Sequence, residues 1–305
     1  MTNKIQEANL AMVVSKTFSG LNVNALRYLL PLWIAPLTGV TFRCVFAAVA
    51  FWIIGYWAKP ETASVKDKIY LFLLGAVGIY GYMFSYLMGL SKTTPVSAAI
   101  FTSMQPIWVF ILSVFFFNEK ATVMKIVGIL VGLGGALLCI STQKSDDLAS
   151  DAFSGNLFCL VSSVIYAVYL ILSNRFLKRT GPYTFSGAAV SSLIVMAFVG
   201  YEASLTTPPL HFWPIALLLF VLIFPTVISY LLIPTGLKYL STTVVAIYGY
   251  LILVVASIVS FLVGQDRFSW EQLGAMLLIC VGVYWVEIAE NNGRERKRPH
   301  SPSIT

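Results

Sequence analysis

The sequence has few charged side chains. Only 11% of its 305 residues are Asp, Glu, Lys or Arg, whereas 58% are hydrophobic. Soluble domains average about 25% charged residues, so this chain lacks the charged surface that a soluble domain needs. Its apolar residues form long runs separated by short polar breaks. This pattern predicts an all-α membrane protein that crosses the bilayer many times.

Cysteine and histidine are scarce as well. The four cysteines each lie in an apolar run and none belongs to a CxxC pair, while His211 and His300 lie at or beyond the ends of the runs. We therefore expect no metal site and no cofactor. The net charge of +7 comes from basic residues scattered among the polar breaks rather than gathered on one face. Nucleic acid is accordingly not expected as a partner.

Carboxylates are missing from the interior of the apolar runs. All 13 Asp and Glu residues lie in polar breaks, near the chain ends or in the last turn of a run, whereas Lys16 and Arg43 lie well inside two runs. An intramembrane aspartyl protease needs paired carboxylates, and a metal-dependent one needs His and acidic ligands, so neither is expected. A Ser–Lys dyad with Lys16 is formally open, but no serine has the flanking turn that a nucleophile needs. We expect no enzymatic activity, no catalytic residue and no proton relay through carboxylates.

A helix needs about 20 apolar residues to cross a bilayer. Ten runs reach that length, and the breaks between them are too short to hold a soluble domain. Glu7 precedes a very short apolar core with no small-residue cleavage site after it, so no cleavable signal peptide is expected. The predicted spans are 8–30, 36–58, 68–90, 95–117, 122–142, 153–176, 183–205, 211–236, 241–263 and 269–289.

Lys and Arg are distributed unevenly between the two sides of the predicted bundle. With both termini on one side, fourteen of the 20 basic residues fall on that side and four on the opposite side, while Lys16 and Arg43 lie within spans. Because basic residues concentrate in cytoplasmic loops, both termini are predicted to be cytoplasmic. The expected location is the inner (plasma) membrane.

The chain contains a weak internal repeat. A shift of 147 residues places 89–120 on 236–267, so that Gly89 falls on Gly236. Both stretches contain the fourth span of a five-span half, and an odd number of spans per half means that the second half is inserted upside down. We therefore predict two inverted five-helix repeats. The predicted divisions are an N-terminal repeat at 1–142, an extracytoplasmic linker at 143–152, a C-terminal repeat at 153–290 and a disordered basic cytoplasmic tail at 291–305.

The order of motifs along the chain resembles a known family. A Gly-Leu pair at 89–90 precedes a polar turn and a span with Pro106 at its middle, which ends in "FFFNEK" before the glycine-rich "GILVGLGGALL". Arg43 in "TFRCVFAA", "YAVYLILSNRFLKR" at 166–179 and "SYLLIPTGLKYL" at 229–240 complete the pattern. Across essentially the whole chain this resembles the EamA-type branch of the drug/metabolite transporter superfamily. The resemblance implies a ten-helix inner-membrane carrier that exports or exchanges small metabolites, often amino acids.

Polar side chains recur at helical spacing within six of the predicted spans. Facing one another across two halves, they favour a water-filled cavity, although each also fits interhelical hydrogen bonding or close packing. Lys16 could instead extend toward the membrane interface, and Arg43 could hydrogen-bond carbonyls freed by an irregular helix. The predicted solute-binding residues are Lys16, Ser19, Asn22, Tyr82, Thr102, Gln105, Tyr166, Tyr169, Ser229, Tyr230 and Tyr250.

These features together predict a secondary carrier that works by alternating access. Its solute would be an amino acid or a similar zwitterionic or anionic metabolite, because Lys16 offers a positive group and no deeply placed carboxylate could hold a cation. A nucleotide-sugar or phosphate-headgroup carrier, and a non-transporting membrane sensor or assembly subunit, stay open as alternatives. The expected partners are the small-molecule solute and the lipid bilayer. The oligomeric state and the coupling ion do not follow from the sequence.

Overall fold

The computed structural model describes residues 2–30, 32–57, 64–117, 122–142, 151–180, 212–240, 245 and 248–295. All regular secondary structure in this part of the chain is helical, in agreement with the predicted all-α class. The helices are α1 (Thr2–Leu29), α2 (Pro36–Trp57), α3 (Val65–Leu74), η1 (Gly75–Gly81), α4 (Tyr82–Lys92), α5 (Pro95–Ser103), α6 (Gln105–Phe117), α7 (Val123–Thr142), α8 (Ala152–Thr180), α10 (Phe212–Val221), η2 (Leu222–Ile228), α11 (Ser229–Tyr239), α13 (Gly249–Val263) and α14 (Trp270–Glu295).

Each predicted span within the described residues falls, wholly or in part, on one helix or one continuous run of helices. The span at 183–205 lies outside the described residues. α1 begins at Thr2 and α14 ends at Glu295, so both terminal helices are longer than predicted. The prediction of a disordered tail is therefore wrong for 291–295, where the polar stretch after the last apolar run continues α14.

The surface of the helices is apolar in the way that contact with lipid requires. Large hydrophobic side chains on three helices, such as Leu262, Val123 and Trp57, are more than three-quarters exposed. In the described chain, three helical stretches are long and apolar enough to cross a membrane, judged by length and composition: Pro95–Leu112, Ala152–Ser173 and Phe212–Tyr239. Shorter apolar helices cover Pro36–Phe51, Val123–Gly135, Gly249–Val263 and Trp270–Gly282.

Two π-helical segments interrupt the third and the eighth predicted spans. η1 lies between α3 and α4, and η2 lies between α10 and α11. η1 covers 75–81 and η2 covers 222–228, so each residue of η1 matches a residue of η2 at the 147-residue shift that relates Gly89 to Gly236. The helices that follow, α4 and α11, obey the same shift at both ends. The two halves therefore share one backbone irregularity at one place, which a chance similarity between apolar helices would not produce.

The fourth predicted span is broken at Met104. Pro106 has no backbone N–H and so cannot donate to the carbonyl of Thr102 four residues earlier. The N–H of Ile107 donates instead to the carbonyl of Met104, three residues before it, at 3.0 Å. The chain therefore runs as α5 up to Ser103 and as α6 from Gln105, with the break beside Pro106.

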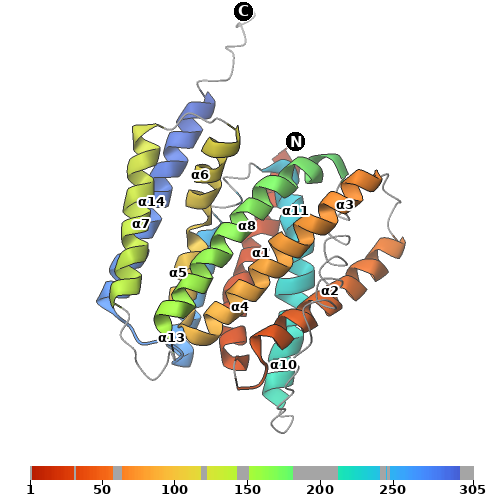
Figure 1. Cartoon of the computed structure of the whole chain (residues 1–305), viewed down its shortest axis with the longest axis horizontal. Helices are drawn as coiled ribbons and strands as arrows, with labels where there is room; N and C mark the ends of the chain where they lie inside the picture. The colour runs from red at the N-terminus through yellow and green to blue at the C-terminus, as the bar shows by residue number, and fades with distance from the viewer. Residues whose placement is uncertain are drawn as a thin grey trace, which may run out of the picture.

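The first helix of each half packs against the other half. α1 contacts α11 and α13, whereas α8 contacts α4 and α6. α1 starts at the same end of the bundle at which α14 finishes (Figure 1), in keeping with two termini on one side. Because α1 packs against the second half and α8 packs against the first, the two halves are in contact along the centre of the molecule.

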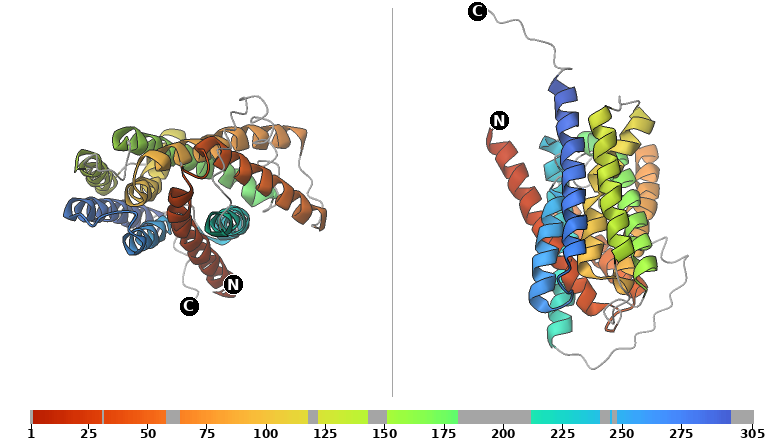
Figure 2. Two further views of the ribbon diagram at one scale, coloured as in Figure 1. Left: turned by 90° about the horizontal axis from the view of Figure 1, so that it is seen from below. Right: turned by 90° about the vertical axis from the view of Figure 1, so that its left-hand side faces the viewer.

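α7 and α14, the last helix of each half, lie side by side at one edge of the bundle (Figures 1 and 2). They approach closely at Gly282, where an added Cβ would lie 2.5 Å from both the Gly128 carbonyl oxygen and the Gly132 nitrogen. A side chain at this position has no room, because the neighbouring atoms belong to backbone. The pair is therefore held by direct backbone contact, as is common where small residues line interfaces between membrane helices.

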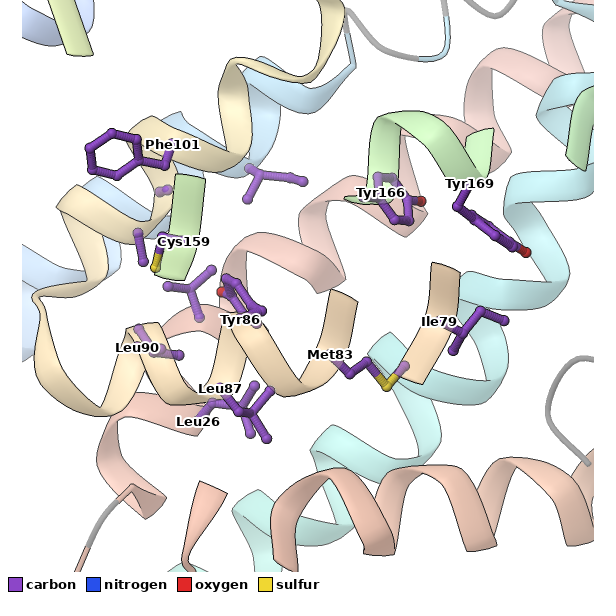
Figure 3. Close-up of a cluster of buried hydrophobic side chains, with 14 of the residues drawn as sticks. Leu26, Ile79, Met83, Tyr86, Leu87, Leu90, Phe101, Cys159, Tyr166 and Tyr169 are labelled. Carbon is purple, nitrogen blue, oxygen red and sulfur yellow. The ribbon is translucent and has the colours of Figure 1, made fainter. Parts of the chain in front are cut away.

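The centre of the bundle is a dense apolar core. Figure 3 shows part of it, with Cys159 of α8 beside Leu90 and Tyr86 of α4, and with Tyr166 and Tyr169 of α8 following in the same direction. Leu90 and Cys159 are fully buried and Tyr86 is 3% exposed. This core surrounds the cavity described next and holds its walls in place.

Candidate solute cavity

A cavity lies in the middle of the bundle, between the two halves. It has about 530 Å³ of atom-free space, counted together with the solvent at its mouth. Side chains from α1, α2, α4, α5, α6, α8, η2, α11 and α13 form its wall. The lining residues are Lys16, Ser19, Asn22, Val23, Arg43, Tyr82, Tyr86, Thr102, Gln105, Tyr166, Pro225, Ser229, Tyr230, Ile233 and Ile252.

Nine of the eleven residues predicted from the sequence line this cavity, and Tyr169 and Tyr250 do not. Tyr169 is 2% exposed and packs against η1, where a Cβ on Gly78 would lie 2.6 Å from its ring. Its ring centroid is 5.9 Å from that of Tyr166, so it supports the wall from behind. Tyr250 is half-buried on α13 and also stands away from the cavity.

Several lining residues were not predicted. Tyr86 could have been found, because it follows Tyr82 by one helical turn and both rings stack at 5.9 Å. The sequence shows Arg43 as a charge inside a predicted span, which fits either a cavity-lining or a structural role. The remaining members are apolar or proline and carry no polar signal in the sequence: Val23, Pro225, Ile233 and Ile252.

The repeat of 147 residues also runs through the cavity wall. In four cases, both members of an equivalent pair line the cavity, one from each half. Corresponding faces of corresponding helices therefore meet at the cavity, while the side chains that they carry differ. The pairs are Ser19 with Tyr166, Tyr82 with Ser229, Tyr86 with Ile233, and Gln105 with Ile252.

Two positive groups face the cavity. Lys16 is 3% exposed, and its Nζ lies 5.9 Å from the ring centroid of Tyr166, within the range of a cation–π contact. Arg43 is 5% exposed, and its Nε donates to Thr226 Oγ1 at 2.9 Å. Along the described chain no carboxylate lines the cavity. The wall of the cavity is thus positively charged at the described residues.

An aromatic wall stands opposite α1. The rings of Tyr82 and Tyr166 are 4.7 Å apart, and Tyr86 stacks on Tyr82. All three are at least partly buried, and they join α4 of the first half to α8 of the second. Such a wall can cover the apolar or planar part of a small molecule while the hydroxyl groups bind its polar part.

Two serine hydroxyls beside Lys16 donate to one carbonyl of α1, and the one from α11 joins the two helices. Ser19 Oγ donates to the Ser15 carbonyl at 2.9 Å, and Ser229 Oγ donates to the same carbonyl at 3.3 Å. Their protons are therefore engaged, and their oxygen lone pairs remain as acceptors. In the described residues no three His, Cys, Asp or Glu side chains come together as a metal ligand set.

The EamA-like transporter family profile matches the chain twice, at residues 6–141 and at residues 153–288. This chain belongs to the EamA-like transporter family. The match confirms the resemblance stated from the motifs, and two domains of one kind account for the repeat of 147 residues. Membership makes the protein a multi-pass membrane transporter, whose partners are a small-molecule solute and membrane lipid. Transporters of this family are generally not enzymes.

Curated relatives in this family are named as transporters. YyaM of Bacillus subtilis (strain 168), an uncharacterized transporter, is 27% identical over 270 residues, which cover 86% of this chain and 88% of that protein. An uncharacterized transporter of Archaeoglobus fulgidus is 23% identical over 239 residues, 78% of this chain and 81% of that protein. The aromatic amino acid exporter YddG of Ancylobacter novellus is 26% identical over 129 residues, 41% of this chain and 45% of that protein.

A solved crystal structure shares the fold. Its TM-score is 0.63 at 18% identity, and the alignment covers 97% of this chain and 99% of that chain. At this identity the likeness extends to the fold alone.

Proposed function

We propose that this EamA-family protein is a secondary carrier for an amino acid or a similar zwitterionic or anionic metabolite, which it exports or exchanges by alternating access. One observation carries the proposal. The central cavity is lined by Lys16 and Arg43 and by no carboxylate of the described chain. A positive group inside a membrane protein costs about 2.5 kcal/mol or more unless it is hydrated or paired. A solute with a carboxylate or phosphate would supply the missing partner.

The tyrosines of the wall support a solute with an apolar or planar portion. Tyr82, Tyr86 and Tyr166 present rings and hydroxyls to the same space as the two cations. A small amino acid needs both kinds of contact, since one end is ionic and the other is often apolar. The similarity to YddG of Ancylobacter novellus, which is named an aromatic amino acid exporter, also supports an amino acid as the first class to test.

The proposed transport cycle uses two inverted five-helix repeats with ten spans, the seventh at 183–205. The positions of η1 and η2, and the double match of the family profile, support two equivalent halves. The excess of Lys and Arg on the side of the termini supports an inner-membrane orientation with both termini in the cytoplasm.

Alternating access requires the halves to separate at one end at a time. At the end where α4 leads into α5, Thr93 Oγ1 donates to Asn156 Oδ1 at 2.7 Å, and Gln265 Nε2 donates to the Asn24 carbonyl at 3.0 Å. Each bond joins one half to the other. On the proposed orientation this end is extracytoplasmic, so these bonds would break when the cavity opens outward.

A nucleotide-sugar or phosphate-headgroup carrier is the second candidate. Two cations in one cavity also suit a phosphate, which carries more negative charge than a carboxylate and accepts several hydrogen bonds. A non-transporting sensor would use the same cavity to bind a solute without moving it.

Solute movement in proteoliposomes separates these possibilities. Full-length protein should exchange at least one labelled amino acid from a panel of the twenty, at a rate well above protein-free liposomes, and Lys16→Met should slow it. Movement of UDP-sugars or glycerol phosphate instead would favour the second candidate. A folded protein that moves none of these solutes would contradict a carrier function.

A further inference from the structure

Arg43 is held by a single threonine from the opposite half. Its Nε donates to Thr226 Oγ1 at 2.9 Å, and Thr226 Oγ1 in turn donates to the Val221 carbonyl at 2.7 Å. Arg43 lies on α2 and Thr226 lies in η2, so this chain of two hydrogen bonds crosses between the halves. Both side chains are buried, Arg43 at 5% exposed and Thr226 at 0%.

The Thr226 hydroxyl has a fixed direction because its proton is engaged by the Val221 carbonyl. In an α-helix the residue four places after Val221 would donate its N–H to the Val221 carbonyl, but that residue is Pro225, which has no N–H; the π-helical pattern of η2 moves the backbone donor one residue further along the chain. The hydroxyl of Thr226 donates to this carbonyl. A hydroxyl has one proton and two lone pairs, so it can then only accept from Arg43. Because arginine has donors and no acceptor, the bond can form in this direction alone.

This arrangement leaves one edge of the guanidinium for the cavity. Nε–H is engaged by Thr226, and the two Nη groups carry the other four N–H donors. Within the described chain no acceptor bonds these Nη groups, and Arg43 lines the cavity. Two parallel N–H groups on one planar edge match the two oxygens of a carboxylate or phosphate.

We propose that Arg43 binds the anionic group of the solute in a bidentate manner and that Thr226 is its positioning residue. This inference rests on the proposed carrier function. π-Helical segments are rare and often occur at functional sites, and here the segment places the one hydroxyl that orients the guanidinium. The position in η1 that corresponds to Thr226 is Ile79, which has no hydroxyl. The hydrogen-bond acceptor for a guanidinium is therefore present in η2 and has no counterpart in η1.

The two variants Thr226→Val and Arg43→Lys test the positioning role. Thr226→Val keeps the shape but removes the acceptor, so the guanidinium loses its fixed direction. Arg43→Lys keeps the charge but removes the planar pair of donors. Thr226→Ser restores the hydroxyl. Thr235→Val serves as the matched control, because Thr235 lies on α11, its hydroxyl bonds the Leu231 carbonyl of its own helix, and it does not line the cavity.

Equilibrium binding to full-length protein in nanodiscs would be measured for L-phenylalanine, L-leucine and L-glutamine. Each amino acid would be compared with the derivative in which its α-carboxyl group is an amide. The amide lacks the carboxylate and keeps the rest of the molecule. Wild-type protein should prefer the acid by tenfold or more, equivalent to about 1.4 kcal/mol. Thr226→Val and Arg43→Lys should reduce this preference by at least roughly threefold, since a hydrogen bond to a charged group is among the stronger ones. Thr226→Ser and Thr235→Val should keep it.

The outcomes separate the inference from the proposed function. If wild-type protein binds none of the six compounds, or binds acid and amide equally, the proposal of an amino acid carrier fails. If wild-type protein prefers the acid and folded Thr226→Val keeps the whole preference, the positioning role of Thr226 is overturned. If Thr226→Val does not fold, Arg43→Lys decides, and an unchanged preference there overturns the inference. A uniform loss of affinity for acids and amides in either variant would mean a structural role and would also overturn it.

Discussion

Replacement of Lys16 by methionine should change stability and solute affinity in opposite directions. Methionine has a similar length but no charge. The change removes the cost of holding a cation in the membrane interior, about 2.5 kcal/mol or more, and also removes the contact with the Tyr166 ring, worth about 1 kcal/mol. The difference leaves a stabilisation of about 1 to 2 kcal/mol. Affinity for an anionic or zwitterionic solute should fall tenfold or more, about 1.4 kcal/mol.

Melting temperature and binding would be measured on the same nanodisc preparations. Lys125→Met is the matched control, because Lys125 is also buried at 5% exposed and its Nζ lies 4.2 Å from the Phe110 ring centroid, but it does not line the cavity. The control should leave solute affinity unchanged. Unchanged affinity in Lys16→Met would remove Lys16 from the solute site, and a lower melting temperature together with normal affinity would assign it a structural role instead.

Three further predictions concern the rest of the molecule. Burial raises the pKa of the Asp266 carboxyl above its ordinary value, although hydrogen bonds to the carboxylate oppose this shift. The folded state therefore binds this proton more tightly than the unfolded state, and the protein loses stability as the pH rises through the raised pKa. The melting temperature of wild type relative to D266N should therefore increase as the pH is lowered from 7 toward the ordinary carboxyl pKa of 3.8, and a pH-independent difference would contradict this assignment. Gly282→Ala should destabilise the protein by about 1 to 3 kcal/mol, because its Cβ would meet the backbone of α7. Gly134→Ala has open space around the added Cβ and should leave stability unchanged. Equal melting temperatures for the two variants would refute the close contact. In a cysteine-free background, Asp151→Cys should react with an impermeant thiol reagent added to intact cells and Ser64→Cys should not, and the reverse pattern would invert the proposed orientation.

The apolar pattern was sufficient to predict the helices and their approximate places. A run of about 20 apolar residues has few alternatives to a membrane helix, since the bilayer offers no partner for unpaired backbone groups. The shift of 147 residues followed from local similarity. The helix ends were less predictable. Polar residues after 290 carry no apolar signal, yet α14 continues to Glu295.

Most of the cavity could also be predicted, because polar side chains in apolar helices face an interior more often than lipid. The errors arise where helix rotation decides the outcome. Tyr86 lies one turn after Tyr82 on α4 and also lines the cavity, although it is not among the residues predicted from the sequence. Tyr169 is predicted as a solute-binding residue, but Gly78 leaves room for its ring against η1.

Composition, spacing and the internal repeat thus determined the class of protein, its helices, its two similar halves and the positive character of its interior. Each of these depends on short-range chemistry that can be read along one chain. The tertiary structure alone decided that Arg43 faces the cavity and that Thr226 holds it. These two residues are 183 positions apart on helices of different halves, and neither has a sequence signal for the other. Their contact exists because α2 packs beside η2, where the Thr226 hydroxyl donates to the Val221 carbonyl and so can only accept from the guanidinium.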